Sequence, residues 1–127
     1  MDSWYLYQTE QNELINYIKN NGITNVIVIS GDLHSGGAID DGSGTISCSI
    51  GWCIPEISVP HTNIYSEALC TGGSCGTWSI GVLQSMDSVT KISNAGFAHF
   101  TVTNTSLLMQ VIREDGKINL SHSIPAQ

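Results

Sequence analysis

The sequence has few basic residues and no long apolar segment. It carries 4 Lys and Arg against 11 Asp and Glu, a formal net charge of −7. Proteins that bind nucleic acids or anionic membrane surfaces depend on clusters of Lys and Arg, so this balance argues against both partners. A membrane-spanning helix needs about 20 consecutive apolar residues, whereas the longest apolar run, residues 26–29, has only strand length. We therefore expect no nucleic-acid binding and no membrane span.

Signatures of nucleotide-dependent enzymes are missing, and those of serine-dependent enzymes are incomplete. Residues 72–76 match the letters Gly-x-Ser-x-Gly, but no predicted helix follows them as a nucleophile elbow requires, and Ser35 has no evident base behind it, which argues against a serine nucleophile. The glycine-rich residues 72–76 lack the lysine of a phosphate-binding loop. What is present is a chain of 127 residues, a length that suits one compact domain.

Four cysteines form two pairs that are close in the sequence, Cys48 with Cys53 and Cys70 with Cys75. Their CxxxxC spacing differs from the knuckles of structural zinc sites. Local disulfides formed in an oxidising compartment are the favoured interpretation, with free buried thiols or a zinc site as alternatives. Four cysteines allow three pairings, and the spacing does not choose among them.

The first part of the chain predicts a helix followed by a buried strand. Thr9 can cap a helix over residues 10–19, and Gly22 suits the left-handed position that ends it. Three apolar residues form one stripe of this helix: Leu14, Ile15 and Ile18. Residues 26–29 are an unbroken β-branched run, which is typical of a central strand covered on both faces. The order of helix, turn and buried strand indicates an α/β fold.

The last third of the chain predicts antiparallel strands. Residues 96–103 alternate between two faces, as a strand does. Asp115-Gly116 stands between two extended runs, residues 107–113 and 118–124, and Asp-Gly in this position is a strong hairpin signal. We therefore expect a C-terminal antiparallel β hairpin.

The residues best suited to chemistry follow the predicted buried strand. Asp32 and His34 lie two positions apart, so in an extended segment their side chains project to the same side. Ligands of open α/β sheets bind at this end of a strand. A carboxylate suits Ca, Mg, Mn or ferric iron, and an imidazole suits Zn and Fe. We expect Asp32 and His34 to be metal ligands, although a turn aspartate with a surface histidine is the alternative.

A catalytic metal needs about three protein ligands. His61, on the long irregular stretch between about residues 51 and 76, is the best third candidate. Asp40-Asp41 could reach a second ion but resembles a solvated turn. Glu56 is an acid in apolar surroundings and is interpreted as a structural anchor bonded to backbone amides. The two remaining histidines are expected to be ordinary sheet residues: His99 and His122.

The order of these motifs resembles the C-terminal part of alkaline phosphatase D-type metallophosphoesterases. The most specific piece is the strand that runs into Ser-Gly-Asp-x-His at residues 30–34. Softer pieces support it: the predicted helix, Pro-Glu-Ile-Ser-Val-Pro at 55–60, Gly-Thr-Trp-Ser at 76–79, residues 96–103 and the Asp-Gly hairpin. The resemblance covers most of the chain.

The resemblance implies a fold and an activity. The fold is a two-sheet αββα sandwich. The activity is hydrolysis of small phosphomonoesters or phosphodiesters at divalent or mixed metal ions, among Ca, Fe, Zn, Mn and Mg. In the family the aspartate and histidine of Gly-Asp-x-His sit at the metal centre, which matches Asp32 and His34. The family is exported by bacteria, so a periplasmic or secreted location is expected. The first residues, 1–4, carry no signal peptide, so an export signal would lie upstream.

The family's earlier motifs, an aspartate-rich Gly-Asp segment and an Asn-His-Asp-like segment, are absent from the 127 residues. We therefore interpret the chain as one domain, residues 1–127, that forms the C-terminal portion of a longer enzyme and needs an N-terminal half as its partner; a degenerate stand-alone protein is the alternative. Alone it should have little or no activity. The competing hypothesis is a non-catalytic, β-rich binding or structural domain.

Overall fold

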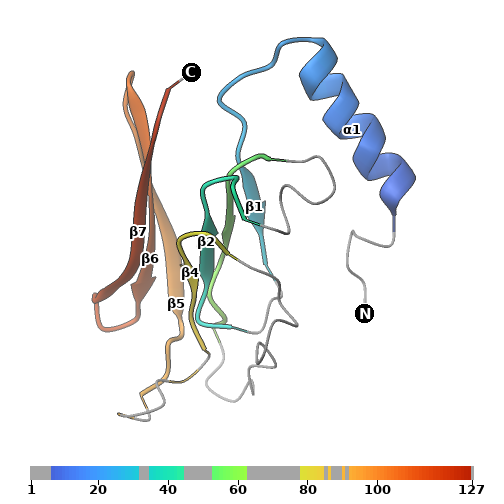
Figure 1. The fold of residues 1–127 in the computed structure, drawn as a ribbon. Coiled ribbons are helices and arrows are strands. Elements are labelled where there is room, and N and C mark those ends of the chain that lie inside the picture. Colours follow the sequence, from blue (N-terminus) through green and yellow to red (C-terminus); the bar gives the residue numbers. More distant parts are fainter. Residues whose placement is uncertain are drawn as a thin grey trace.

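A computed structural model describes residues 7–31, 35–44, 53–62, 78–84, 86, 90 and 92–126. These residues form a mixed α/β architecture of one N-terminal helix, a four-stranded mixed sheet and a three-stranded antiparallel sheet. Figure 1 shows three layers side by side: the three-stranded sheet, the four-stranded sheet, and helix α1 on the far side of the latter. The predicted α/β class, N-terminal helix and C-terminal hairpin are confirmed. Within the described residues, no helix has the length and apolarity needed to cross a membrane.

Helix α1 spans Gln8–Asn20 and packs through part of the predicted stripe. Ile15 is buried and Ile18 is partly buried, whereas Leu14 is 43% exposed. Gly22 has a φ of +59°, as expected for the left-handed residue after a helix. The predicted Thr9 cap is wrong, because the helix starts at Gln8 and no side chain caps it. Thr9 therefore lies inside the first turn.

The four-stranded sheet has the order β1-β3-β2-β4. Its strands are short: β1 Val28–Ser30, β2 Ala38–Asp40, β3 Glu56–Ser58 and β4 Gly81–Val82. β1 and β3 run parallel, whereas β2 is antiparallel to both β3 and β4. The parallel pair sets the position of the candidate site, because the carboxyl ends of β1 and β3 lie next to each other at the same end of the sheet.

The prediction that residues 26–29 form a central, fully buried strand is wrong. In the described part of the sheet β1 is the edge strand, paired with β3 alone, and Ile29 is 58% exposed. Its neighbours divide between two layers. Ile27 packs between the sheets and Val28 packs towards α1. A short β-branched run has the same sequence pattern whether the strand is central or at an edge, so the pattern alone could not distinguish them.

The three-stranded sheet is an antiparallel meander of β5 Gly96–Val102, β6 Ser106–Arg113 and β7 Ile118–Pro125. The Asp-Gly turn joins β6 to β7 as predicted. Gly116 has a φ of +85°, and its N–H donates to the carbonyl oxygen of Arg113 at 2.9 Å. This positive φ is the reason that the turn favours glycine.

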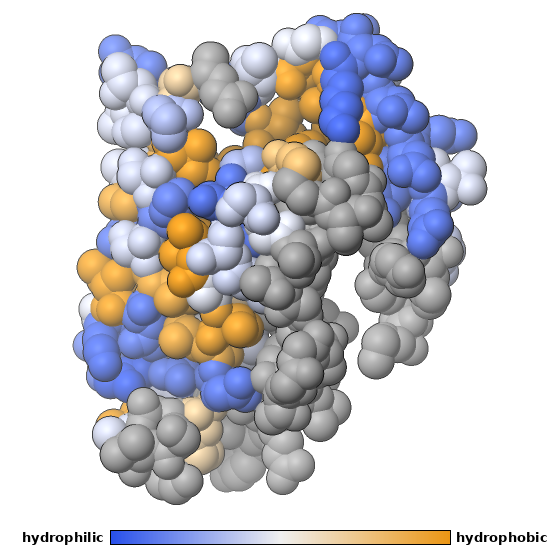
Figure 2. Space-filling model, viewed as in Figure 1, coloured by the Kyte–Doolittle hydropathy of each residue, from blue (hydrophilic) through white to orange (hydrophobic). Residues whose placement is uncertain are grey.

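The main core lies between the two sheets. Ile39 and Ile57 from the four-stranded sheet pack with Met109 and Val111 from β6, and all four are at most 1% exposed. A smaller core around Ile15 and Ile54 fixes α1 to the other face. Figure 2 shows apolar side chains on the surface over the sheets and beneath the largely hydrophilic helix.

Candidate functional site

The carboxyl ends of β1 and β3 bring two distant segments together. The Val59 N–H donates to the carbonyl oxygen of Ser30 at 2.9 Å, which extends the parallel pairing by one residue. Two residues later, the His61 N–H donates to the carbonyl oxygen of Ser35 at 3.1 Å. The segment 59–61 therefore runs beside the two ends of the Gly31–Ser35 connection.

The two principal predicted ligands, Asp32 and His34, lie outside the described residues. Their neighbours Gly31 and Ser35 are described, and both lie beside segment 59–61. The would-be Cβ of Gly31 is 3.4 Å from a methyl carbon of Val59. The scaffold on either side of Asp32 and His34 is thus part of the parallel strand ends.

His61 is the one predicted ligand that the structure describes. It is partly buried, and both of its backbone groups are bonded. Its N–H bonds to Ser35, and its carbonyl oxygen accepts from the Gly96 N–H at 3.2 Å. Among the described residues, no group of three or more His, Cys, Asp and Glu side chains could hold a metal ion. A metal centre that includes His61 would therefore need donors from outside the described residues, where the predicted ligands Asp32 and His34 lie.

The glycines after the predicted motif allow close packing of its C-terminal flank. A Cβ on Gly36 would lie 2.5 Å from the carbonyl oxygen of Gln84 and 2.6 Å from the Cβ of Asn94. Gly37 has a φ of +98° and leaves room for Val111. Ser35, which is 1% exposed, accepts a hydrogen bond on its Oγ from the Gly37 N–H at 3.1 Å. These contacts give Ser35 a structural role and hold this flank against the rest of the domain.

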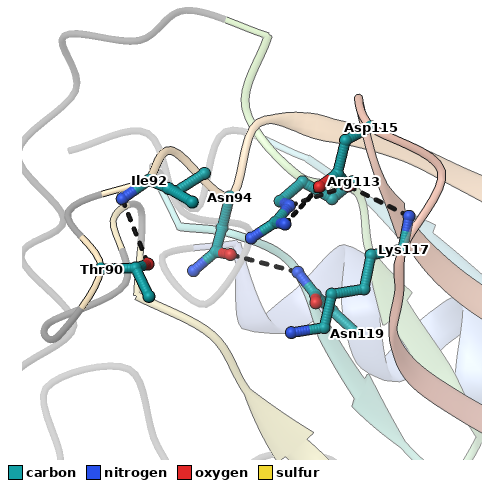
Figure 3. A network of polar contacts seen from close by, with 7 residues as sticks. All are labelled: Thr90, Ile92, Asn94, Arg113, Asp115, Lys117 and Asn119. Carbon is teal, nitrogen blue, oxygen red and sulfur yellow. Dashed lines mark hydrogen bonds and ion pairs between the residues drawn. The ribbon is translucent and has the colours of Figure 1, made fainter.

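A polar network braces the same region from the other sheet (Figure 3). The Asn94 side chain donates to the carbonyl oxygen of Gln84 at 2.9 Å and accepts from the Asn119 amide at 3.1 Å. Nearby, the buried Arg113 pairs with Asp115 through two hydrogen bonds. This guanidinium, helped by the Lys117 N–H, lowers the pKa of Asp115 to about 2. The Asn94 contacts hold the start of β5 beside Gly36 and β7, and the Arg113–Asp115 pair stabilises the β6–β7 turn itself.

Asp40 does not belong to a solvated turn, so that prediction is wrong for this residue. Its side chain is 1% exposed and accepts three backbone N–H groups. Oδ1 accepts from Gly42 at 2.7 Å and Gly44 at 3.1 Å, and Oδ2 accepts from Ser79 at 3.1 Å. The sequence could not reveal this role, because the Ser79 partner is 39 residues away.

Asp41 is exposed, as the prediction of a solvated turn requires, but it is also bonded locally. Its Oδ1 accepts from the Ser43 N–H at 2.9 Å and from the Ser79 hydroxyl at 2.7 Å. Hydrogen bonds from Ser43 and then Ser79 lower the pKa of Asp41 to about 2, and His122 contributes a smaller electrostatic effect. Asp40 and Asp41 thus organise their own loop rather than present free carboxylates.

Glu56 stands opposite Asp40 in the β2–β3 register. Burial raises the pKa of Glu56, the Ser30 hydroxyl partly offsets this, and the charge of Asp40 adds to the increase. Ser58, two residues along the same face, is fully buried, and its Oγ has no hydrogen-bond partner. This face of the sheet is polar, which the sequence did not reveal because the residues come from three separate strands.

Two other features can be compared with the predictions. His99 and His122 lie within β5 and β7, as expected, and Nδ1 of His99 is 3.2 Å from Oε1 of Gln110. Cys53 forms a disulfide, so it is neither a free thiol nor a zinc ligand, and the local pairing of the cysteines stays a prediction. Its partner is one of the other three cysteines, which lie outside the described residues.

No family model, no curated protein and no solved structure matches this chain. The chemistry of the residues and their placement at the strand ends are therefore the basis for a functional hypothesis.

Proposed function

We propose that the protein is a metal-dependent phosphoester hydrolase of the alkaline phosphatase D type, with this chain supplying the C-terminal half of the fold and part of the metal site. One observation carries the proposal. The carboxyl ends of the parallel strands β1 and β3 lie side by side. Beyond them, the His61 N–H donates to the carbonyl oxygen of Ser35, at the end of the Gly31–Ser35 connection. Such strand ends are the usual ligand sites of α/β sheets.

The donor set suits a catalytic cation. Asp32 supplies a carboxylate, and His34 and His61 supply imidazoles, a combination compatible with Zn, Fe or Mn, with Mg and Ca as further candidates. A bound cation would neutralise charge on the phosphoryl oxygens and activate a water. The chain's own contribution is to hold the three donors, with His61 fixed by its two backbone hydrogen bonds.

The proposal includes an alternative role for His34. An imidazole titrates near neutral pH, so His34 could protonate the leaving oxygen instead of binding metal. The glycines that follow let its C-terminal flank pack tightly: Gly36 lies against Gln84 and Asn94. Such packing restrains the described backbone on the C-terminal side of the histidine.

The complete enzyme would be an αββα sandwich that also includes an N-terminal half. In this proposal helix α1, the four-stranded sheet and the three-stranded sheet would be three of its four layers. Among the described strands β1 pairs with β3 alone, and this edge position, with Ile29 exposed beside it, supports additional strands there. The disulfide at Cys53 supports the periplasmic or secreted location, because disulfides persist in oxidising compartments.

Calorimetric titration with Mn²⁺ tests the metal site. We expect the substitutions Asp32→Ala, His34→Ala and His61→Ala each to weaken binding at least about tenfold. His99→Ala is the matched control, because His99 is exposed on β5 and bonded to Gln110. Unchanged affinity in all three site variants would overturn the proposal in favour of a non-catalytic domain.

Hydrolysis of an aryl phosphate tests whether activity needs the proposed N-terminal half. With added Mn²⁺ or Zn²⁺, we expect this chain to have little activity and a longer polypeptide with the N-terminal half to be active. Equal activity of the two would contradict the need for an N-terminal half.

A further inference from the structure

A shallow hollow lies directly beside His61. It has a volume of about 210 Å³ and is lined by Thr62, Ala95, Gly96, Phe97 and Glu114. The hydrogen bond from the Gly96 N–H to the His61 carbonyl oxygen, 3.2 Å long, joins its wall to the predicted ligand. The hollow and the candidate metal site therefore share one stretch of backbone, residues 61–62.

The size of the hollow limits what it can hold. Pockets that enclose whole drug-sized ligands measure about 300–1,000 Å³. A space of about 210 Å³ is smaller and open, so it suits one substituent of a molecule that is bound elsewhere by another group. The adjacent strand ends are the place where a phosphate would be held under the proposed function.

The lining favours an apolar or aromatic substituent. Phe97 is 52% exposed and belongs to neither apolar core, so its ring is available at the surface. Across the outer face of the three-stranded sheet it pairs with Ile112, which pairs with the half-exposed Ile118. An aromatic ring stacked against Phe97 would gain both burial and the favourable geometry of aromatic pairs.

Charge disfavours a second anionic group in the hollow. Glu114 is exposed at its wall, and the chain carries a net charge of −7. A carboxylate or additional phosphate placed there would be repelled, whereas an uncharged ring would not. The lining therefore favours esters of phenols and apolar alcohols over polyphosphates.

We propose that this hollow receives the aromatic or apolar leaving group of the phosphate ester, with Phe97 as the specificity-determining contact. This assignment rests on the proposed function for the location of the phosphate. The part concerning the ring depends only on the five described residues of the hollow.

The test uses amide NMR of the whole chain with three probes: benzyl alcohol, phenylphosphonate and methylphosphonate. Benzyl alcohol without metal should shift the amide signals of Thr62, Ala95 and Gly96. Phe97→Ala should abolish these shifts. Val102→Ala is the matched control, because Val102 is a 76% exposed apolar residue at the other end of the same strand, and it should leave them unchanged.

With Zn²⁺, phenylphosphonate should bind about tenfold more tightly than methylphosphonate, and Phe97→Ala should remove this preference. Absence of benzyl alcohol shifts, or equal shifts in Phe97→Ala, would overturn the assignment of the hollow even if Zn²⁺ promotes methylphosphonate binding. Conversely, benzyl alcohol shifts without any Zn²⁺-dependent phosphonate binding would overturn the proposed function and the leaving-group role, and leave only an aromatic-binding surface.

Discussion

Replacement of Asp40 by asparagine should destabilise the fold by about 2–3 kcal/mol. The carboxylate is buried and accepts N–H groups from Gly42, Gly44 and Ser79. Asparagine retains one acceptor oxygen for the two glycines, but its amide NH₂ would face the Ser79 N–H. One charge-assisted hydrogen bond, worth about 1.5–3 kcal/mol, is therefore lost and a buried donor is left unpaired.

Urea unfolding followed by circular dichroism measures this cost. With a slope of about 2 kcal/mol per molar urea, the midpoint of Asp40→Asn should fall by about 1–1.5 M without a change in slope. Asp41→Asn is the control at the neighbouring position. Because Asp41 is exposed, we expect that variant to lose only about 1 kcal/mol after allowance for solvent screening.

Two outcomes would refute the structural role of Asp40. One is a midpoint for Asp40→Asn that equals the midpoint of Asp41→Asn. The other is unchanged stability combined with lost Mn²⁺ binding, which would make Asp40 a metal ligand rather than the anchor of its own loop.

Three further results are expected. Glu56→Gln should stabilise the metal-free fold at pH 8 and give no gain at pH 4. Because the folded state raises the pKa of Glu56, the protonated carboxyl stabilises the fold below pH 4.5, its ordinary pKa, and this stabilisation is lost as pH rises through the folded-state pKa. A stability gain of Glu56→Gln that grows on acidification would contradict this. Gly36→Ala should cost about 1–3 kcal/mol, because its Cβ would meet a backbone carbonyl at 2.5 Å, and urea midpoints equal to wild type would disprove this contact. Met109→Ala, at a fully buried core position, should cost about 2–5 kcal/mol in the same assay, whereas the exposed Met86→Ala should cost little.

Local signals predicted the elements that depend on neighbouring residues. Gly22 ended the helix and Asp115-Gly116 formed the hairpin turn, because both features need only a positive φ at a glycine within one turn. The spacing of the apolar residues likewise predicted that the Ile15 side of the helix packs against the core. Such features follow from short-range sterics and periodicity.

Features that depend on distant partners could not be predicted. The β-branched run at residues 26–29 predicted a central strand, but the position of β1 at the sheet edge depends on which other strands pair with it. The burial of Asp40 depends on Ser79, and the raised pKa of Glu56 depends on an adjacent strand. The proximity of His61 to Ser35 likewise follows from the parallel pairing of β1 with β3 rather than from spacing.

Mn²⁺-induced line broadening in amide NMR spectra tests the proposed cation site most directly. Below equimolar Mn²⁺, the account predicts that the signals of Gly31, Ser35 and His61 broaden first, while Val102, at the opposite end of β5 from Gly96, stays sharp. Broadening centred on the exposed carboxylates of Asp41 or Asp115, or spread evenly over the chain, would contradict a cation held at the ends of β1 and β3.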